Sequence, residues 1–146
     1  GAEGQSIFRR ADALDPHWAM TRPALIQPFQ PAIQSEGEYS FIFIDGNYSH
    51  CTLKRAASGD YRIQSLYGGT ELKVVPAAPD KASASLIVEL LPLPTPLYAR
   101  IDMVRGNDGQ LLLMEAELIE PYLYPEQGLE LGPRLAAGIE KRLAGI

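Results

Sequence analysis

Three carboxylates interrupt one of the most apolar stretches of the chain. The stretch reads LLLMEAELIEP at residues 111–121, and it carries Glu115, Glu117 and Glu120. Burying a carboxylate without a partner costs on the order of several kcal/mol. These side chains therefore need an arginine, a metal ion, or water on an exposed face of a strand.

A second charged and apolar stretch precedes the first one. It reads LYARIDMVR at residues 97–105, and the turn-forming residues GNDG at 106–109 separate the two stretches. Two such runs around a short turn predict a β-hairpin. Because side chains alternate between the faces of a strand, Arg100 and Asp102 share one face of the first strand.

The length of the turn decides whether the charged groups meet. With a two-residue turn at 107–108, Arg100 lies opposite Glu115, Asp102 lies diagonal to Glu115, and Glu117 shares their face. A three-residue loop would put the two sets on opposite faces, because a shift of one residue reverses every side chain. We expect an even loop, so that Asp102, Glu115, Glu117 and Arg100 converge while Glu120 falls on the other face.

Two interpretations of this cluster remain open from the residues alone. It is either an exposed face with cross-strand ion pairs, each worth roughly a few tenths of a kcal/mol, or a metal site. Three acids outnumber one arginine, and the flanking residues Val104, Leu113 and Ile119 are expected to be buried, so the acids would repel one another without a cation. Oxygen ligands favour Mg²⁺ or Mn²⁺ over zinc.

Composition limits the class of protein. The chain has 146 residues, of which 46% are hydrophobic and 21% charged, as expected for one globular domain with a core. Its formal net charge of -5 argues against nucleic acid or an anionic membrane as the main partner. Cys51 is the only cysteine, which excludes a disulfide framework and predicts a core thiol. No signal peptide or membrane-spanning run is evident, so we expect a cytoplasmic location.

The remaining patterns predict an α+β domain of mostly antiparallel sheet with flanking helices. The clearest is a hairpin in residues 38–55, where runs rich in Ile, Phe and Tyr flank Asp45-Gly46-Asn47. Phe41 and Phe43 alternate with Ile42 and Ile44 in its first strand, which predicts a central strand buried on both sides. Further expected elements are short strands in 24–31 and 61–66, a strand after Gly68-Gly69, a helix after Pro79, and an amphipathic C-terminal helix with Leu135, Ile139 and Leu143 on one face.

Four segments, in this order, resemble the C-terminal half of the ATP-grasp ligases. They are IQPFQPAIQSEGEYSFIFIDGNYSHCTLKR at 26–55, GDYRIQSLYGGT at 59–70, YARIDMV at 98–104, and LLLMEAELIEP at 111–121. The resemblance is to the glutathione-synthetase and RimK-like branch, which includes the D-cycloserine cyclo-ligases, and it covers nearly the whole chain. The order and spacing of the four segments make the resemblance specific.

The resemblance implies a nucleotide site. Gln27, Pro28 and Phe29 match the hinge whose backbone holds the adenine edge, Glu38 matches an acid beside the ribose, and Lys54 matches a basic group near the nucleotide. Three further positions match residues close to the phosphates and the acyl-phosphate centre: Arg62, and the tight glycine turn of Gly68 and Gly69.

The resemblance also implies roles for the charged hairpin. Asp102, Glu115 and Glu117 match the positions that hold magnesium on the triphosphate, although the family commonly has asparagine at the position of Glu117. Arg62 and Arg100 are the expected electrostatic partners of the reacting groups, and Arg100 is expected mainly to orient Glu115.

The implied activity is ATP- and Mg²⁺-dependent ligation of a small-molecule carboxylate to an amine, through an acyl-phosphate intermediate. We expect residues 1–146 to be one ATP-grasp C-terminal domain, a fragment that lacks the N-terminal domain and most of the lid, including a phosphate-binding lysine. A homo-oligomer is compatible with this resemblance. The alternatives are an ATP-grasp-like domain that binds nucleotide for regulation, and an interaction domain whose acids form a solvated face.

Overall fold

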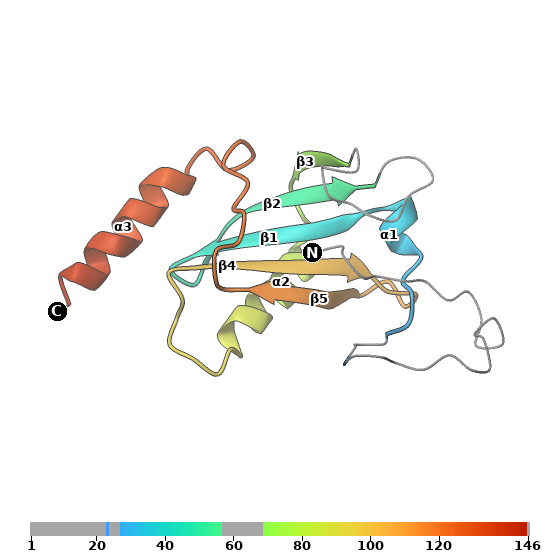
Figure 1. Ribbon diagram of the computed structural model, residues 1–146, viewed down its shortest axis with the longest axis horizontal. Coiled ribbons are helices and arrows are strands. Elements are labelled where there is room, and N and C mark those ends of the chain that lie inside the picture. The colour runs from blue at the N-terminus through green and yellow to red at the C-terminus, as the bar shows by residue number, and fades with distance from the viewer. Residues whose placement is uncertain (1–22, 24–26, 57–68, 146) are drawn as a thin grey trace.

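A computed structural model describes residues 23, 27–56 and 69–145 of the chain. Five antiparallel strands form one sheet in the order β3-β2-β1-β4-β5, with helices at its sides (Figure 1). The α+β architecture predicted from the sequence is therefore confirmed. The strands are β1 (Glu38–Ile44), β2 (Asn47–Arg55), β3 (Thr70–Val74), β4 (Tyr98–Arg105) and β5 (Leu111–Glu117), and the helices are α1 (Ala32–Ser35), α2 (Ala78–Glu89) and α3 (Leu131–Leu143).

The first hairpin forms where the sequence predicts it. Ile44 pairs directly with Asn47, so the turn consists of Asp45 and Gly46, with Asn47 already in β2. Both turn residues have positive φ, 49° and 75°, which matches the right-handed twist of the flanking strands. A Cβ atom at Gly46 would lie 2.7 Å from a methyl group of Thr95, so this position also needs glycine for space.

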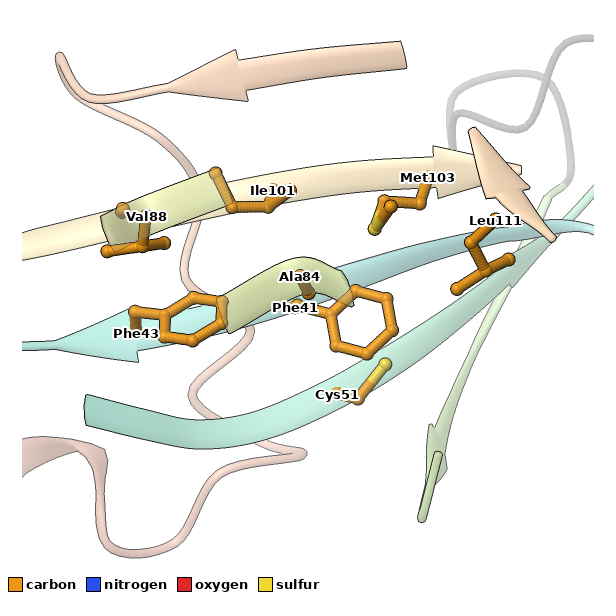
Figure 2. Packing of buried hydrophobic residues seen from close by; sticks show 9 residues of the cluster. Phe41, Phe43, Cys51, Ala84, Val88, Ile101, Met103 and Leu111 are labelled. Atoms are coloured by element: carbon orange, nitrogen blue, oxygen red, sulfur yellow. The ribbon is translucent and has the colours of Figure 1, made fainter. Parts of the chain in front are cut away.

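The central strand is buried on both faces, as expected. Phe41 and Phe43 of β1 join the core between the sheet and α2, where they meet Ala84 and Val88 (Figure 2). The remaining buried members of this core are Cys51, Ala99, Ile101, Met103 and Leu111. The alternate residues Ile42 and Ile44 form a second cluster with Tyr124 and Leu131 on the other face.

The face opposite α2 carries a row of polar residues across four strands. Thr52 of β2 pairs with Ser40 of β1, Ser40 pairs with Asp102 of β4, and Asp102 pairs with Glu115 of β5. Thr52 and Ser40 are fully buried, and Asp102 is 2% exposed. Polar side chains at such depth require hydrogen-bond or ionic partners, which identifies this face as the chemically interesting one.

Helix α3 differs in burial from the expected amphipathic pattern. The helix is present and Leu135 packs against the second cluster, but Ile139 and Leu143 are 42% and 65% exposed. Its C-terminal end is held instead by charge: Lys141 Nζ and Arg142 Nη1 lie 2.8 Å and 2.7 Å from the carboxylate of Asp45.

Other element boundaries differ from the sequence prediction in small ways. Helix α2 begins at Ala78, so Pro79 lies in the first turn, where its missing N–H costs nothing. The short strand expected in 24–31 is not formed by residues 27–30, which have no regular structure and are followed by α1. Residues 24–26 and the strand expected at 61–66 lie outside the described residues. No helix in the described ranges combines the length and apolarity needed to cross a membrane.

Candidate functional site

Two irregularities in the second hairpin decide where its charged side chains point. The first is the turn: Arg105 pairs with Leu111, and the N–H of Gly106 donates to the carbonyl of Gln110 at 2.8 Å. Three residues therefore form the loop, with Gly109 at φ 81°. The expectation of a two-residue turn is wrong, and this loop alone would put the acids and Asp102 on opposite faces.

The second irregularity restores the common face. Met103 pairs with Leu113, whereas Asp102 pairs with Glu115, so β5 contains one extra residue, Met114. Such a bulge shifts the alternation by one position. The predicted convergence of the charged groups is thus confirmed, although for a different reason from the one expected.

The bulge also corrects three details of the prediction. Arg100 lies opposite Glu117 rather than Glu115, and Asp102 lies directly opposite Glu115. Leu113 pairs with Met103 and so leaves the carboxylate face. The prediction that the flanking residues are buried was also wrong in part. Val104 is fully buried, but Leu113 and Ile119 are 48% and 86% exposed.

Three carboxylates form a compact group of oxygen ligands. One oxygen atom from each of Asp102, Glu115 and Glu117 lies within 4.8 Å of the other two. The Asp102 side chain is buried, Glu117 is partly buried and Glu115 is exposed. The group therefore extends from the interior of the sheet to its surface, where a ligand can reach it.

Asp102 is the most heavily bonded member of the group. Ser40 Oγ donates a hydrogen bond of 2.6 Å to Asp102 Oδ1, and Lys54 Nζ lies 3.2 Å from Oδ2. Arg100 Nε donates to both oxygens at 3.1 Å. Four lone-pair positions on one carboxylate are enough for these donors, so the orientation of Asp102 is fixed from several sides.

The two cations also connect Asp102 to the other acids. Lys54 forms a second ion pair with Glu38, and Arg100 Nη2 forms one with Glu117. Burial opposes the charge on Lys54, but Asp102 and Glu38 outweigh burial and raise its pKa. Burial likewise opposes the charge on Arg100, and Asp102 again outweighs it and raises the pKa of Arg100. Both cations therefore stay charged.

The acids carry more negative charge than these cations neutralise. Burial raises the pKa of Glu117, and repulsion from Glu115 and Asp102 adds to the effect against the attraction of Arg100. In their charged forms, the four acids Glu38, Asp102, Glu115 and Glu117 face two cations, an excess of two negative charges. A divalent cation with a preference for oxygen, Mg²⁺ or Mn²⁺, fits both the charge and the ligand atoms.

The other residues predicted for the nucleotide lie partly away from this group. Glu38 and Lys54 belong to its ionic network. Gln27, Pro28 and Phe29 are exposed ahead of α1, and Gly69 precedes β3; among the described residues these four form no side-chain hydrogen bond or ion pair with the carboxylates. Arg62 and Gly68 lie outside the described residues.

Sequence reasoning missed two residues on this face, Ser40 and Tyr124. Ser40 is recognisable only once β1 is paired with β4, because its partner Asp102 is 62 positions away. Tyr124 is 4% exposed and has φ 49°, and it lies in the irregular segment after β5. A buried tyrosine in a segment without periodic pattern gives no sequence signal for its position.

Comparison with known proteins identifies relatives of this chain. No protein-family model matches the chain. The cycloserine biosynthesis protein DcsG of Streptomyces lavendulae is 31% identical over 129 residues, which cover 82% of this chain and 42% of DcsG. The crystal structure of D-cycloserine synthetase DcsG superposes with a TM-score of 0.67 at 27% identity, over 80% of this chain and 41% of that one.

A more distant structure shares the fold. The ATP-grasp ligase PsnB, solved with a phosphomimetic variant of its minimal precursor, Mg and ADP, superposes with a TM-score of 0.51 at 18% identity. The match covers 70% of this chain and 32% of PsnB. This chain is related to the ATP-grasp ligases over part of their length. This chain spans about 42% of the length of DcsG.

Proposed function

We propose that this chain binds Mg²⁺ or Mn²⁺ together with ATP, as part of an ATP-dependent carboxylate–amine ligase. The observation that carries the proposal is the group of Asp102, Glu115 and Glu117, each of which places one carboxylate oxygen within 4.8 Å of the other two. The relation to the ATP-grasp ligases supports it independently of that geometry.

The residues of this face have distinct proposed tasks. Asp102, Glu115 and Glu117 would hold the metal, which when bound neutralises phosphate charge during transfer to a carboxylate. Arg100 is a positioning residue, because it bonds to Asp102 and Glu117 at once and so fixes the distance between them. Lys54 lies beside Asp102 and presents a second positive charge on the same face.

The nucleotide and substrate assignments have a different basis. Gln27, Pro28, Phe29, Gly68 and Gly69, with Arg62, are proposed for ATP from their match to the family segments. Glu38 is proposed for the ribose, and its ion pair with Lys54 makes it a partner of that cation as well. The substrates are proposed to be a small-molecule carboxylate and an amine, in line with ligase chemistry.

Calorimetry with Mg²⁺ and ATP tests this proposal. Glu115→Gln keeps the shape of the side chain but removes its charge, so we expect binding of the Mg²⁺–ATP complex to weaken at least about tenfold. Glu120→Gln is the matched control, because Glu120 is also exposed and close in sequence but does not belong to the three-carboxylate group. Equal affinities of the wild-type chain and Glu115→Gln would contradict the proposal.

A second assay separates a ligase from a domain that binds nucleotide for regulation. Phosphate release from ATP is measured on the longest natural form of the protein, with and without added amino acids. A ligase releases phosphate only when a carboxylate and an amine are both present. Nucleotide binding without such release would support the regulatory alternative.

A further inference from the structure

A lysine is buried on the face of the sheet that carries the three carboxylates. Lys54 of β2 is 7% exposed, and it pairs across the sheet with Glu38 of β1, which is also 7% exposed. Lysine is almost never buried to this extent unless its charge is paired. The function of Lys54 therefore follows from its partners.

The ammonium group of Lys54 is divided between two acids. Its Nζ atom forms an ion pair with Glu38 and lies 3.2 Å from Oδ2 of Asp102. A hydrogen bond between an ammonium group and a carboxylate is usually about 2.7–2.9 Å long. The contact with Asp102 is longer than that, so Asp102 holds this lysine loosely.

The oxygens of Asp102 are already occupied by donors. Ser40 Oγ donates to Oδ1 at 2.6 Å, Arg100 Nε donates to both oxygens at 3.1 Å, and Arg100 Nη2 lies 3.0 Å from Oδ2. Together with Lys54, these groups claim the roughly four lone-pair positions that a carboxylate offers. A metal ion that binds Asp102 must therefore displace one of these donors.

Two of the donors are held in place. Arg100 also forms an ion pair with Glu117 and donates to the carbonyl of Tyr122, and its planar guanidinium cannot leave one partner without disturbing the others. Ser40 has a single proton, which it already donates to Asp102 in a short hydrogen bond.

Lys54 is the donor that can give way. Its ammonium group carries three N–H donors on a flexible four-carbon stem, so it can turn away from one acid without losing the other. When Lys54 leaves Asp102, it keeps its ion pair with Glu38, and its buried charge remains neutralised.

We infer that Lys54 is an internal competitor for Asp102 and thereby sets the affinity of these carboxylates for a divalent cation. In the metal-free chain, Lys54 neutralises part of the charge on Asp102. When the metal binds, it replaces Lys54 at Oδ2, and Lys54 keeps Glu38 as its partner. The inference rests on the proposed function, since it concerns the same metal site.

A charge-neutral double variant separates this competition from simple repulsion between cations. Lys54→Met/Glu38→Gln removes one positive and one negative group, so the net charge stays the same while Asp102 loses its competing donor. We expect the variant to bind Mn²⁺ about tenfold more tightly than the wild-type chain, because the metal no longer displaces a charged hydrogen-bond donor. Free Mn²⁺ is measured by electron paramagnetic resonance.

The control removes a lysine and a glutamate from the next strand. Lys73→Met/Glu71→Gln changes two residues of β3 that pair with Thr52 and Lys54, and neither belongs to the three-carboxylate group. This control should bind Mn²⁺ with wild-type affinity. If folded Lys54→Met/Glu38→Gln bound Mn²⁺ no more tightly than the wild-type chain, the inference would be overturned.

The wild-type chain supplies a second test that depends on no variant being folded. In a chain labelled with nitrogen-15 lysine, saturating Mg²⁺ should shift the Nζ resonance of Lys54, because its ammonium group changes partners, and should leave that of Lys73 unchanged. An unshifted Lys54 resonance would also overturn the inference. If the wild-type chain bound neither Mn²⁺ nor Mg²⁺, the proposed function would fail first, so the two failures are distinguishable.

Discussion

The guanidinium group of Arg100 bridges Asp102 and Glu117. Its Nε donates to both oxygens of Asp102 at 3.1 Å, and its Nη2 forms an ion pair with Glu117. A third donor, Nη1, reaches the carbonyl of Tyr122 at 3.4 Å. One side chain therefore links two strands and the segment after β5, and it does so at the carboxylates proposed to hold a metal.

Removal of this bridge should make the stability of the chain depend on metal. Arg100→Met leaves buried carboxylates without a cation, and we expect it to lower the free energy of unfolding by about 3–5 kcal/mol. Without the competing guanidinium, added Mg²⁺ should stabilise Arg100→Met more than it stabilises the wild-type chain. Denaturant unfolding with and without Mg²⁺ measures both effects. A smaller gain from Mg²⁺ in the variant would show that Arg100 does not share these carboxylates with the metal.

The unusual acid at Glu117 leads to a second prediction. The family resembled by this chain commonly has asparagine there, and an amide oxygen can still bind Mg²⁺. We therefore expect Glu117→Asn to retain metal binding within about tenfold of the wild type, whereas Glu117→Val, which lacks an oxygen ligand, should bind far more weakly. Titration with Mn²⁺ compares the two variants. Equal affinities for both would remove Glu117 from the ligand set.

Much of the fold follows from local sequence patterns. The hairpin at Asp45 and Gly46 requires only that two turn residues separate apolar runs, and the alternation of Phe41 and Ile42 identifies a strand buried on both faces. Both features depend on neighbours in the chain, which is why the sequence predicts them correctly.

The geometry of the site depends on features that a local pattern does not contain. The three-residue loop at Asn107–Gly109 and the extra residue Met114 each move the register by one residue in the same direction. Two such shifts restore the shared face but move the partner of Arg100 from Glu115 to Glu117. The contact of Ser40 with Asp102 needs the pairing of β1 with β4, which joins residues far apart in the chain. Neither bulges nor long-range pairing can be read from spacing alone.

The buried thiol predicts how stability changes at alkaline pH. Burial raises the pKa of Cys51 to about 12, whereas the pKa of a thiol in the unfolded chain is about 8.5. The folded state therefore keeps a proton that the unfolded chain loses. This contribution to stability is complete below the unfolded pKa and is lost as pH rises through about 12.

Comparison with Cys51→Ala isolates the contribution of the thiol. Burial also raises the pKa of Tyr48 to about 12, so ionisation of Tyr48 lowers stability at alkaline pH in the same direction. Because Tyr48 is present in both proteins, its effect cancels in the comparison. The unfolding free energy should therefore fall less steeply from about pH 8 to about pH 11 in Cys51→Ala than in the wild type. Identical slopes would show that the thiol ionises as readily in the folded chain as in the unfolded one.

Binding of Mn²⁺ by Asp102→Asn tests the central claim most directly. Asparagine keeps the size of the side chain and an oxygen for Ser40, but it removes the charge that the metal needs. We predict one Mn²⁺ site in the wild-type chain that Mg²⁺ competes for, unchanged binding in Glu120→Gln, and at least about tenfold weaker binding in Asp102→Asn. Absence of binding in the wild-type chain, or wild-type affinity in correctly folded Asp102→Asn, would contradict a metal site at these carboxylates.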